Sequence, residues 1–225
     1  MKKIVFIVFL LGSVGAFAQS ERLTDLGAIV SAEASVGLGG NFGLSMEEEL
    51  RFKNCCTQFD RWLNSVGVDY SCLRNRLNLG LAADYIRRYN DKGYYENRAR
   101  LGLQATYTEE YRQFKFQVRT KLIGTFLDPA TGEHRTNPKL YCRNRLKVTW
   151  QPINSRFKYA LSTELFWLTN DPKGSYVDNL RTVLSVDYRL ARRYWLSGFL
   201  RMDNDLQVKE PVDRFYVGLT VKAKY

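Results

Sequence analysis

Hydrophobic and polar residues alternate along most of the chain. Between Leu140 and Trp150 one alternate row is apolar except for Asn144, and the other is polar and carries Arg143, Arg145 and Lys147. Because a strand sends successive side chains to opposite faces, this segment predicts a strand with one apolar and one basic face. The order Arg-x-Arg-Leu-x-(Leu/Val) also occurs at 74–79 and 98–103.

Further segments of similar length alternate in the same way, are separated by turn residues, and show no useful helical period. The expected strands are 26–36, 42–52, 61–70, 77–85, 95–107, 114–122, 140–150, 157–167, 179–188, 194–203 and 215–225. Repeated weak alternation is typical of a transmembrane β-barrel. We therefore expect an all-β fold, an antiparallel up-and-down transmembrane barrel of ten to twelve strands. Twelve is preferred because single-chain bacterial barrels use even numbers, which leaves one strand unassigned near 21–26 or an N-terminal segment that re-enters the lumen.

The last expected strand ends the sequence. It places Phe215, alternate apolar residues and the terminal Tyr225 on one face, as the C-terminal signal of bacterial outer-membrane proteins does. This strand predicts the barrel-assembly machinery as a partner. The alternative is an edge strand of a soluble sandwich, because alternation alone does not separate the two. Glu48 falls on the apolar row of 42–52 and is a defect in the pattern.

Loop lengths and aromatic residues favour the membrane alternative. Connections after every second strand are expected to be longer, which is typical of barrels with short periplasmic turns and longer outer loops. Aromatic residues near the strand ends form two candidate interface belts. One belt comprises Tyr70, Tyr107, Trp150, Tyr188, Tyr194 and Tyr225, and the other Phe52, Tyr85, Tyr95, Trp167 and Phe215.

The N-terminus resembles a secretory signal peptide. Lys2 and Lys3 precede the apolar run 4–11, and Ala16-Phe17-Ala18 fits a cleavage site. A transmembrane anchor is the weaker alternative, because the apolar run is short. We expect 1–18 to be removed after export by the Sec pathway, 19–225 to form the barrel domain, and the protein to reside in the outer membrane of a Gram-negative bacterium, in contact with its lipid.

The formal net charge is +11, and removing Lys2 and Lys3 with the signal peptide lowers it to +9. A basic exported protein suits anionic lipid, polyanionic sugar or nucleic acid, but here the basic rows alternate with apolar ones. If the apolar rows face lipid, the basic rows face the lumen, and no nucleic-acid partner is expected. The candidate lumen residues for contact with anions are Arg76, Arg98, Arg100, Arg119, Lys121, Arg143, Arg145 and Arg181. The inward rows also contain Arg51, Arg61, Lys147, Arg201, Glu33, Glu47, Glu49, Asp84, Glu96, Glu164 and Asp203.

Two interpretations of these arginines remain open. They line a narrow pore for small anionic solutes, because guanidinium groups stay charged and bind carboxylate or phosphate. Alternatively they pair with the acidic residues and fill the lumen of a structural or surface-interaction barrel, whose outer loops, 126–138 above all, act on partners.

Other chemistry has little support. An outer-membrane hydrolase is a remote alternative, because it needs a serine with a histidine base and the single histidine, His134, falls in an expected loop. We expect no enzyme activity, no catalytic residues, no cofactor and no metal site. The spacing of Cys55, Cys56, Cys72 and Cys142 matches no metal motif and leaves the disulfide pairing open.

The chain resembles the DUF2490 family of uncharacterised outer-membrane β-barrel proteins, common in Bacteroidetes. The resemblance rests on Asp25-Leu26-Gly27, Glu47-Glu48-Glu49-Leu50-Arg51, the Arg-x-Arg-Leu segments and Glu164-Leu165-Phe166. It covers nearly all of the chain after the signal peptide. It implies location and fold and assigns no activity.

Overall fold

The computed structural model describes residues 23–90, 93–128, 137–207 and 211–225. These residues form eleven strands and no helix. The strands are β1 (Leu23–Gly39), β2 (Phe42–Lys53), β3 (Gln58–Cys72), β4 (Leu77–Tyr89), β5 (Tyr95–Tyr111), β6 (Phe114–Leu127), β7 (Lys139–Trp150), β8 (Phe157–Leu168), β9 (Tyr176–Arg189), β10 (Tyr194–Asp205) and β11 (Val212–Lys224). The expected signal peptide 1–18 and His134 lie outside the described residues, as does most of the expected loop 126–138.

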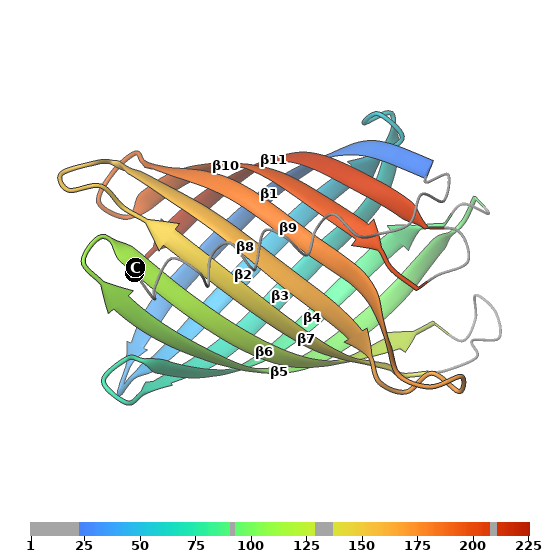
Figure 1. Cartoon of the computed structure of the whole chain (residues 1–225), viewed down its shortest axis with the longest axis horizontal. Helices are drawn as coiled ribbons and strands as arrows, with labels where there is room; N and C mark the ends of the chain where they lie inside the picture. Colours follow the sequence, from blue (N-terminus) through green and yellow to red (C-terminus); the bar gives the residue numbers. More distant parts are fainter. Residues whose placement is uncertain (1–22, 91–92, 129–136, 208–210) are drawn as a thin grey trace, which may run out of the picture.

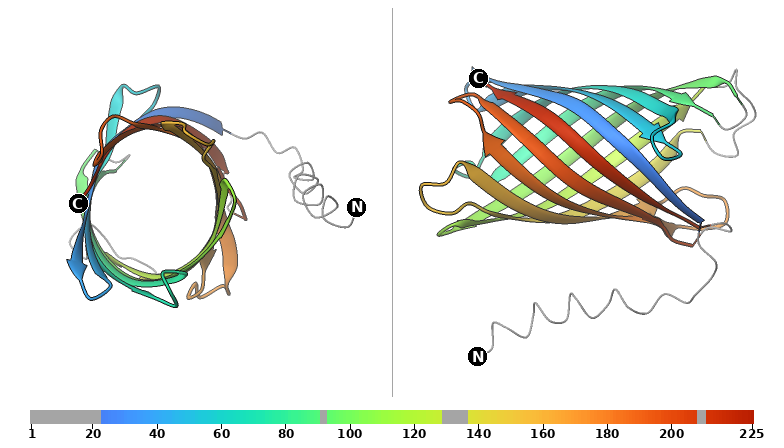
Figure 2. Two further views of the ribbon diagram at one scale, coloured as in Figure 1. Left: turned by 90° about the vertical axis from the view of Figure 1, so that its left-hand side faces the viewer. Right: turned by 90° about the horizontal axis from the view of Figure 1, so that it is seen from above.

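The strands close into a single barrel, seen along its length in Figure 1 and down its axis in Figure 2. Each strand pairs antiparallel with the next along the chain, which confirms the all-β barrel. The closing pair differs, because β1 pairs with β11 in parallel, Leu23 opposite Val212. The eleven described strands fall within the expected ten to twelve, one short of the preferred even number. The parallel pair is what allows an odd number to close.

The barrel has two ends, which we call the C-terminal end and the loop end. The C-terminal end carries Tyr225 and the connections 40–41, 73–76, 112–113, 151–156 and 190–193. The loop end carries Leu23 and the connections 54–57, 90–94, 128–138, 169–175 and 206–211. The longest connection, 128–138, is at the loop end as expected, but the alternation is incomplete, because 54–57 is shorter than 151–156. Since the strand number is odd, the first strand starts at the loop end and the last one finishes at the other.

The seam between β1 and β11 depends on a glycine. Gly27 lies opposite Tyr216, and the Tyr216 ring rests on it. A Cβ atom at Gly27 would come within 2.6 Å of the Tyr216 ring and would also meet the Phe52 carbonyl oxygen of β2. Because backbone on one side and an aromatic ring on the other fill this space, only glycine fits there without a shift.

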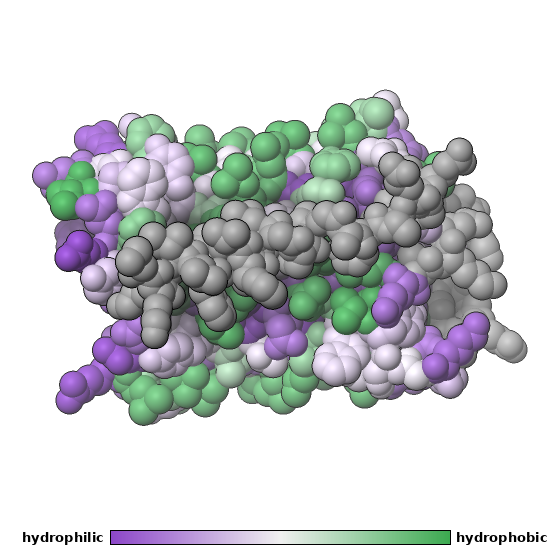
Figure 3. Space-filling model, viewed as in Figure 1, coloured by the Kyte–Doolittle hydropathy of each residue, from purple (hydrophilic) through white to green (hydrophobic). Residues whose placement is uncertain are grey.

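The outer face of the barrel is apolar. Large hydrophobic residues point outward on every strand, among them Leu81, Leu101 and Val217, each more than half exposed. In Figure 3 hydrophobic residues are spread over the visible length of the barrel, and many hydrophilic residues lie toward the two ends. Glu48 is exposed on this face between Ala32 of β1 and Asn64 of β3, which confirms that it interrupts the apolar row.

The interior is polar and is packed most tightly toward the loop end. Most of its buried residues lie in the half of a strand nearest that end, including Ile29, Ile86, Leu127 and Leu168 among the apolar ones. Arg51, Asp60 and Glu96 are buried in the same half. The half nearer the C-terminal end contains smaller or half-buried side chains, which leaves space within the barrel.

Candidate functional site

A cavity of about 980 Å³ occupies the inside of the barrel. It extends from residues at the loop end, such as Leu23 and Val212, to Thr220 and Lys222 farther along β11. Its wall contains sixteen lysine and arginine side chains against nine of aspartate and glutamate. The cavity is therefore positively charged overall, as the alternating rows predict. A smaller cavity of about 150 Å³ shares Glu33 and Lys222 with it and reaches Lys224.

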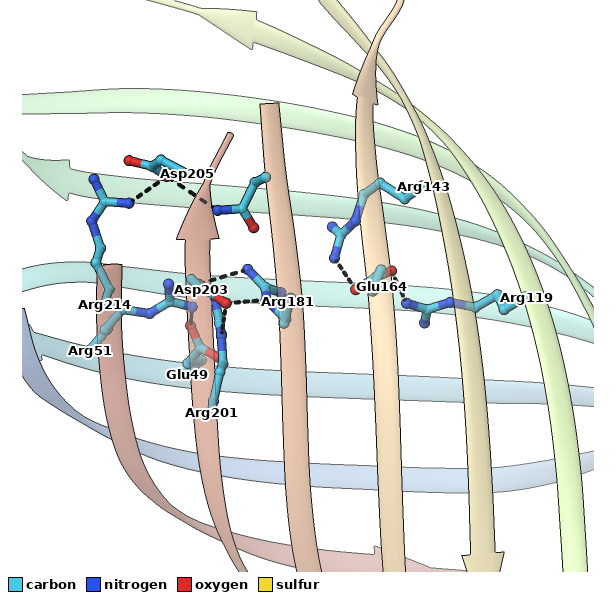
Figure 4. A network of polar contacts seen from close by, with 11 residues as sticks. Glu49, Arg51, Arg119, Arg143, Glu164, Arg181, Arg201, Asp203, Asp205 and Arg214 are labelled. Carbon is cyan, nitrogen blue, oxygen red and sulfur yellow. Dashed lines mark hydrogen bonds and ion pairs between the residues drawn. The ribbon is translucent and has the colours of Figure 1, made fainter. Parts of the chain in front are cut away.

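Glu164 of β8 joins two of the arginines predicted from the sequence. Its Oε1 atom accepts a hydrogen bond from Arg119 Nη2 at 2.6 Å, and its Oε2 atom accepts one from Arg143 Nη2 at 2.8 Å (Figure 4). The Glu164 side chain is only 5% exposed. A buried carboxylate between two guanidinium groups links β6, β7 and β8 from inside.

Asp203 of β10 has the same role on the neighbouring strands. Arg181 Nε donates to its Oδ1 atom at 2.8 Å, and Arg201 pairs with both of its oxygens. Next to it, Arg214 Nη1 donates to Asp205 Oδ1 at 2.8 Å (Figure 4). These contacts connect β9, β10 and β11.

Two aromatic rings each contact two arginines of this network. The Tyr216 ring lies near the guanidinium groups of Arg51 and Arg201, at 5.2 Å and 5.3 Å from its centroid. Phe166 lies in the same way near Arg143 and Arg181. Cation–π contacts of this kind attract each guanidinium group to the ring and so offset part of the repulsion between neighbouring arginines.

A further buried pairing involves Asp60, which accepts from Arg61 Nε at 2.8 Å and lies 3.6 Å from Arg88 Nε. Alternation does not predict that Asp60 points inward, because Asp60 and Arg61 are adjacent and simple alternation sends only one of them inward. A bulge opposite Arg51 and Phe52 shifts the register of β3 at this point. A bulge re-aims a side chain, and the sequence carries no signal for it here.

Four cations on the cavity wall differ from those above. Arg100 of β5, Lys121 of β6, and Arg145 and Lys147 of β7 line the cavity, and within the described part of the chain none of them forms an ion pair or a side-chain hydrogen bond. Lys121 lies across Gly102, with its Cε atom 2.7 Å from where a Cβ atom on that glycine would be. These side chains present unpaired positive charge to the cavity, and we call them the free basic cluster.

The opposite wall carries carboxylates. Glu33 of β1 and Glu47 of β2 are register partners and both line the cavity. Neither forms an ion pair with any other described residue. Asp84 of β4 lies beside the free basic cluster instead, in register with Arg100 of β5, and accepts a hydrogen bond from Ser65 at 2.7 Å.

The predicted residues thus fall into three groups. Arg98, Arg119, Arg143 and Arg181 line the cavity and are ion-paired, Arg98 with Glu96 at 2.7 Å. Arg100, Lys121 and Arg145 line it and belong to the free basic cluster. Arg76 was placed wrongly, because β4 begins only at Leu77 and Arg76 lies in the exposed turn 73–76, where it pairs with Glu109 at 3.4 Å.

The described part of the chain also shows how its possible metal ligands and its cysteines are arranged. It contains no group of three or more histidine, cysteine or acidic residues that would hold a metal ion. All four cysteines are free. Among these residues there is also no helix with the length and hydrophobicity needed to cross a membrane.

These features define the structural class of the protein, which is a closed β-barrel with an apolar outer face and a charged, net basic interior. The chain belongs to the family described as "Protein of unknown function (DUF2490)", whose model matches residues 27–207. The match runs from β1 past the end of β10, so that β11 lies beyond it. No curated protein sequence matches the chain significantly.

Proposed function

We propose that the protein is an outer-membrane barrel that admits small anionic solutes through its basic lumen. The observation that carries the proposal is the free basic cluster, Arg100, Lys121, Arg145 and Lys147, on the wall of the cavity of about 980 Å³. All four side chains are half-buried, and a partly desolvated cation without a counter-charge is unfavourable, so anions that reach the cluster would stabilise it. The excess of basic over acidic groups in the cavity wall also favours anions over cations.

The outer surface supports a membrane location. Closed barrels satisfy all backbone hydrogen bonds between strands, and an apolar outer face then suits lipid. Tyr70, Tyr107 and Trp150 lie on outward positions toward the C-terminal end, and Tyr85, Tyr95 and Trp167 toward the loop end. We further propose that 1–18 acts as the export signal, that the barrel-assembly machinery receives β11, and that the loop end faces outward from the cell.

Planar-bilayer recordings test the pore. We expect wild-type protein to conduct and to prefer chloride to potassium, and the double variant Arg145→Gln/Lys147→Gln to lose most of that preference. Arg76→Gln/Arg112→Gln removes the same charge from exposed turns and is the matched control, with selectivity unchanged. Absence of conductance in folded protein would exclude the pore, and conductance without anion preference would exclude the role given to the cluster.

The second candidate is a plugged barrel that acts structurally or through its outer loops. The ion-pair network at the loop end favours it, because Glu164 and Asp203 each hold two arginines of the same or nearby strands inside the barrel. The same recordings separate the candidates, since a plugged barrel shows no stepwise current. The expectation that the protein is not an enzyme stays a prediction, because His134, on which a hydrolase would depend, lies outside the described residues.

A further inference from the structure

The cavity carries unpaired charges of both signs on facing walls. Strand order places β1 and β7 on opposite sides of the barrel, because four strands lie between them in one direction and five in the other. Glu33 therefore faces Arg145 and Lys147 across the lumen, and it contributes to the electrostatic environment of both. Glu47 of β2 is likewise in electrostatic reach of Lys121 of β6.

The acidic wall is unfavourable for the fold by itself. Glu33 and Glu47 are direct cross-strand partners with the same charge, and such a pair is destabilising. The cation on the other side of Glu33, Lys222 of β11, forms its ion pair with Asp187 at 3.1 Å instead. At the loop end every described carboxylate of the network touches an arginine, whereas these two touch none although unpaired cations lie in the same cavity. The gap between the walls is the space that a solute would fill.

From this arrangement we propose that the lumen selects zwitterionic solutes, of the size of an amino acid or an aminosulfonate. The anionic group would bind the free basic cluster, and the ammonium group would bind Glu33 and Glu47. A plain anion satisfies one wall only and leaves the glutamate pair uncompensated, whereas a zwitterion satisfies both. The inference rests on the proposed function, because the solute has to enter the same interior.

Two probes of nearly equal size test this step. Taurine carries a sulfonate and an ammonium group, and isethionate has a hydroxyl group in place of the ammonium. Saturation-transfer NMR on the mature chain refolded in detergent micelles yields a dissociation constant for each probe without requiring conductance. We expect taurine to bind about tenfold more tightly than isethionate.

Variants of the two walls assign the contacts. Glu33→Gln/Glu47→Gln should weaken taurine to the level of isethionate, while Arg145→Gln/Lys147→Gln should weaken both probes. Glu48→Gln is the matched control, because it removes a glutamate from the same strand on the outer face, and it should change neither. The single variant Glu33→Gln, at an exposed position, serves if the double variant fails to give heat-modifiable gel migration.

The outcomes are distinct. Equal binding of both probes to the wild type, or a taurine preference that survives Glu33→Gln/Glu47→Gln, would overturn zwitterion selection. Either result leaves the anion pore intact if the bilayer recordings show anion preference. No binding of either probe would overturn this inference, and absence of conductance would separately overturn the pore.

Discussion

Arg143 and Arg145 lie two residues apart on β7 and both line the cavity, yet their surroundings differ. Arg143 is held by Glu164 and stacks on Phe166, whereas Arg145 has no ion-pair partner in the described part of the chain. Arg143 therefore links β7 to β8, whereas Arg145 presents an unpaired charge to the cavity. Changing the two together, as their shared motif suggests, would mix a folding effect with a selectivity effect.

Removing the carboxylate that holds two arginines should destabilise the barrel. We expect Glu164→Gln to lower the free energy of unfolding by about 3 kcal/mol, because Arg119 and Arg143 are left buried without a counter-charge. Urea unfolding followed by tryptophan fluorescence in lipid vesicles measures the change.

Glu110→Gln is the control at this scale. Glu110 pairs with Lys115 at 3.0 Å, but both side chains are exposed, 67% for Glu110. Its substitution should cost no more than about 0.5 kcal/mol. Similar unfolding midpoints for Glu164→Gln and Glu110→Gln would show that the buried bridge does not stabilise the barrel.

At the scale of the strand, β1 combines one parallel and one antiparallel neighbour. Its inward row has to meet Tyr216 of β11 on one side and the β2 backbone on the other, and Gly27 is a position where an added Cβ atom would meet both. Closure between β1 and β11 therefore depends on side-chain packing at Gly27 as well as on backbone hydrogen bonds.

A single methyl group at Gly27 should disturb closure. We expect Gly27→Ala to destabilise the barrel by about 1–3 kcal/mol and to lower the refolding yield. The added methyl group would clash with a backbone oxygen, and a change of side-chain rotamer cannot relieve such a clash. Gly198→Ala is the matched control, since nothing lies within 4 Å of a Cβ atom there. Band shift on unheated gels reports folding, and equal yields for the two variants would contradict the role of Gly27 in the seam.

At the scale of the whole molecule, the two ends have distinct native thiols. Cys55 and Cys56 are free and exposed in the connection 54–57 at the loop end. Cys72 is free at the last position of β3, at the C-terminal end. The chain thus contains its own probes for orientation in a membrane.

A membrane-impermeant maleimide should label intact cells through Cys55 and Cys56, because we place the loop end outside. Cys72 should react only after the outer membrane is permeabilised. Labelling of intact cells should therefore persist in Cys72→Ser and vanish in Cys55→Ser/Cys56→Ser. The reverse pattern would show the opposite orientation, and labelling of all sites only in the soluble periplasmic fraction would contradict a membrane location.

The sequence by itself determined the strands and their faces. Alternation has a period of two, so once 140–150 is recognised as a strand, Arg143, Arg145 and Lys147 must share one face, and the same reasoning placed Arg98, Arg119 and Arg181. Closure of an amphipathic sheet then buries the polar face, which is why the basic interior was predictable. Arg76 shows the limit, because alternation does not mark where a strand begins.

Only the tertiary structure decided which charges meet. Pairing inside the barrel depends on strand order, register and the bulge in β3, which bring Glu164 to Arg119 and Arg143, put Asp60 inside, and leave Arg145 facing Glu33 at a distance. Glu164 is 21 residues from Arg143 and 45 from Arg119 along the chain, so local alternation holds no information about these contacts. The parallel seam between β1 and β11 was decided in the same way, by the closure of the whole sheet.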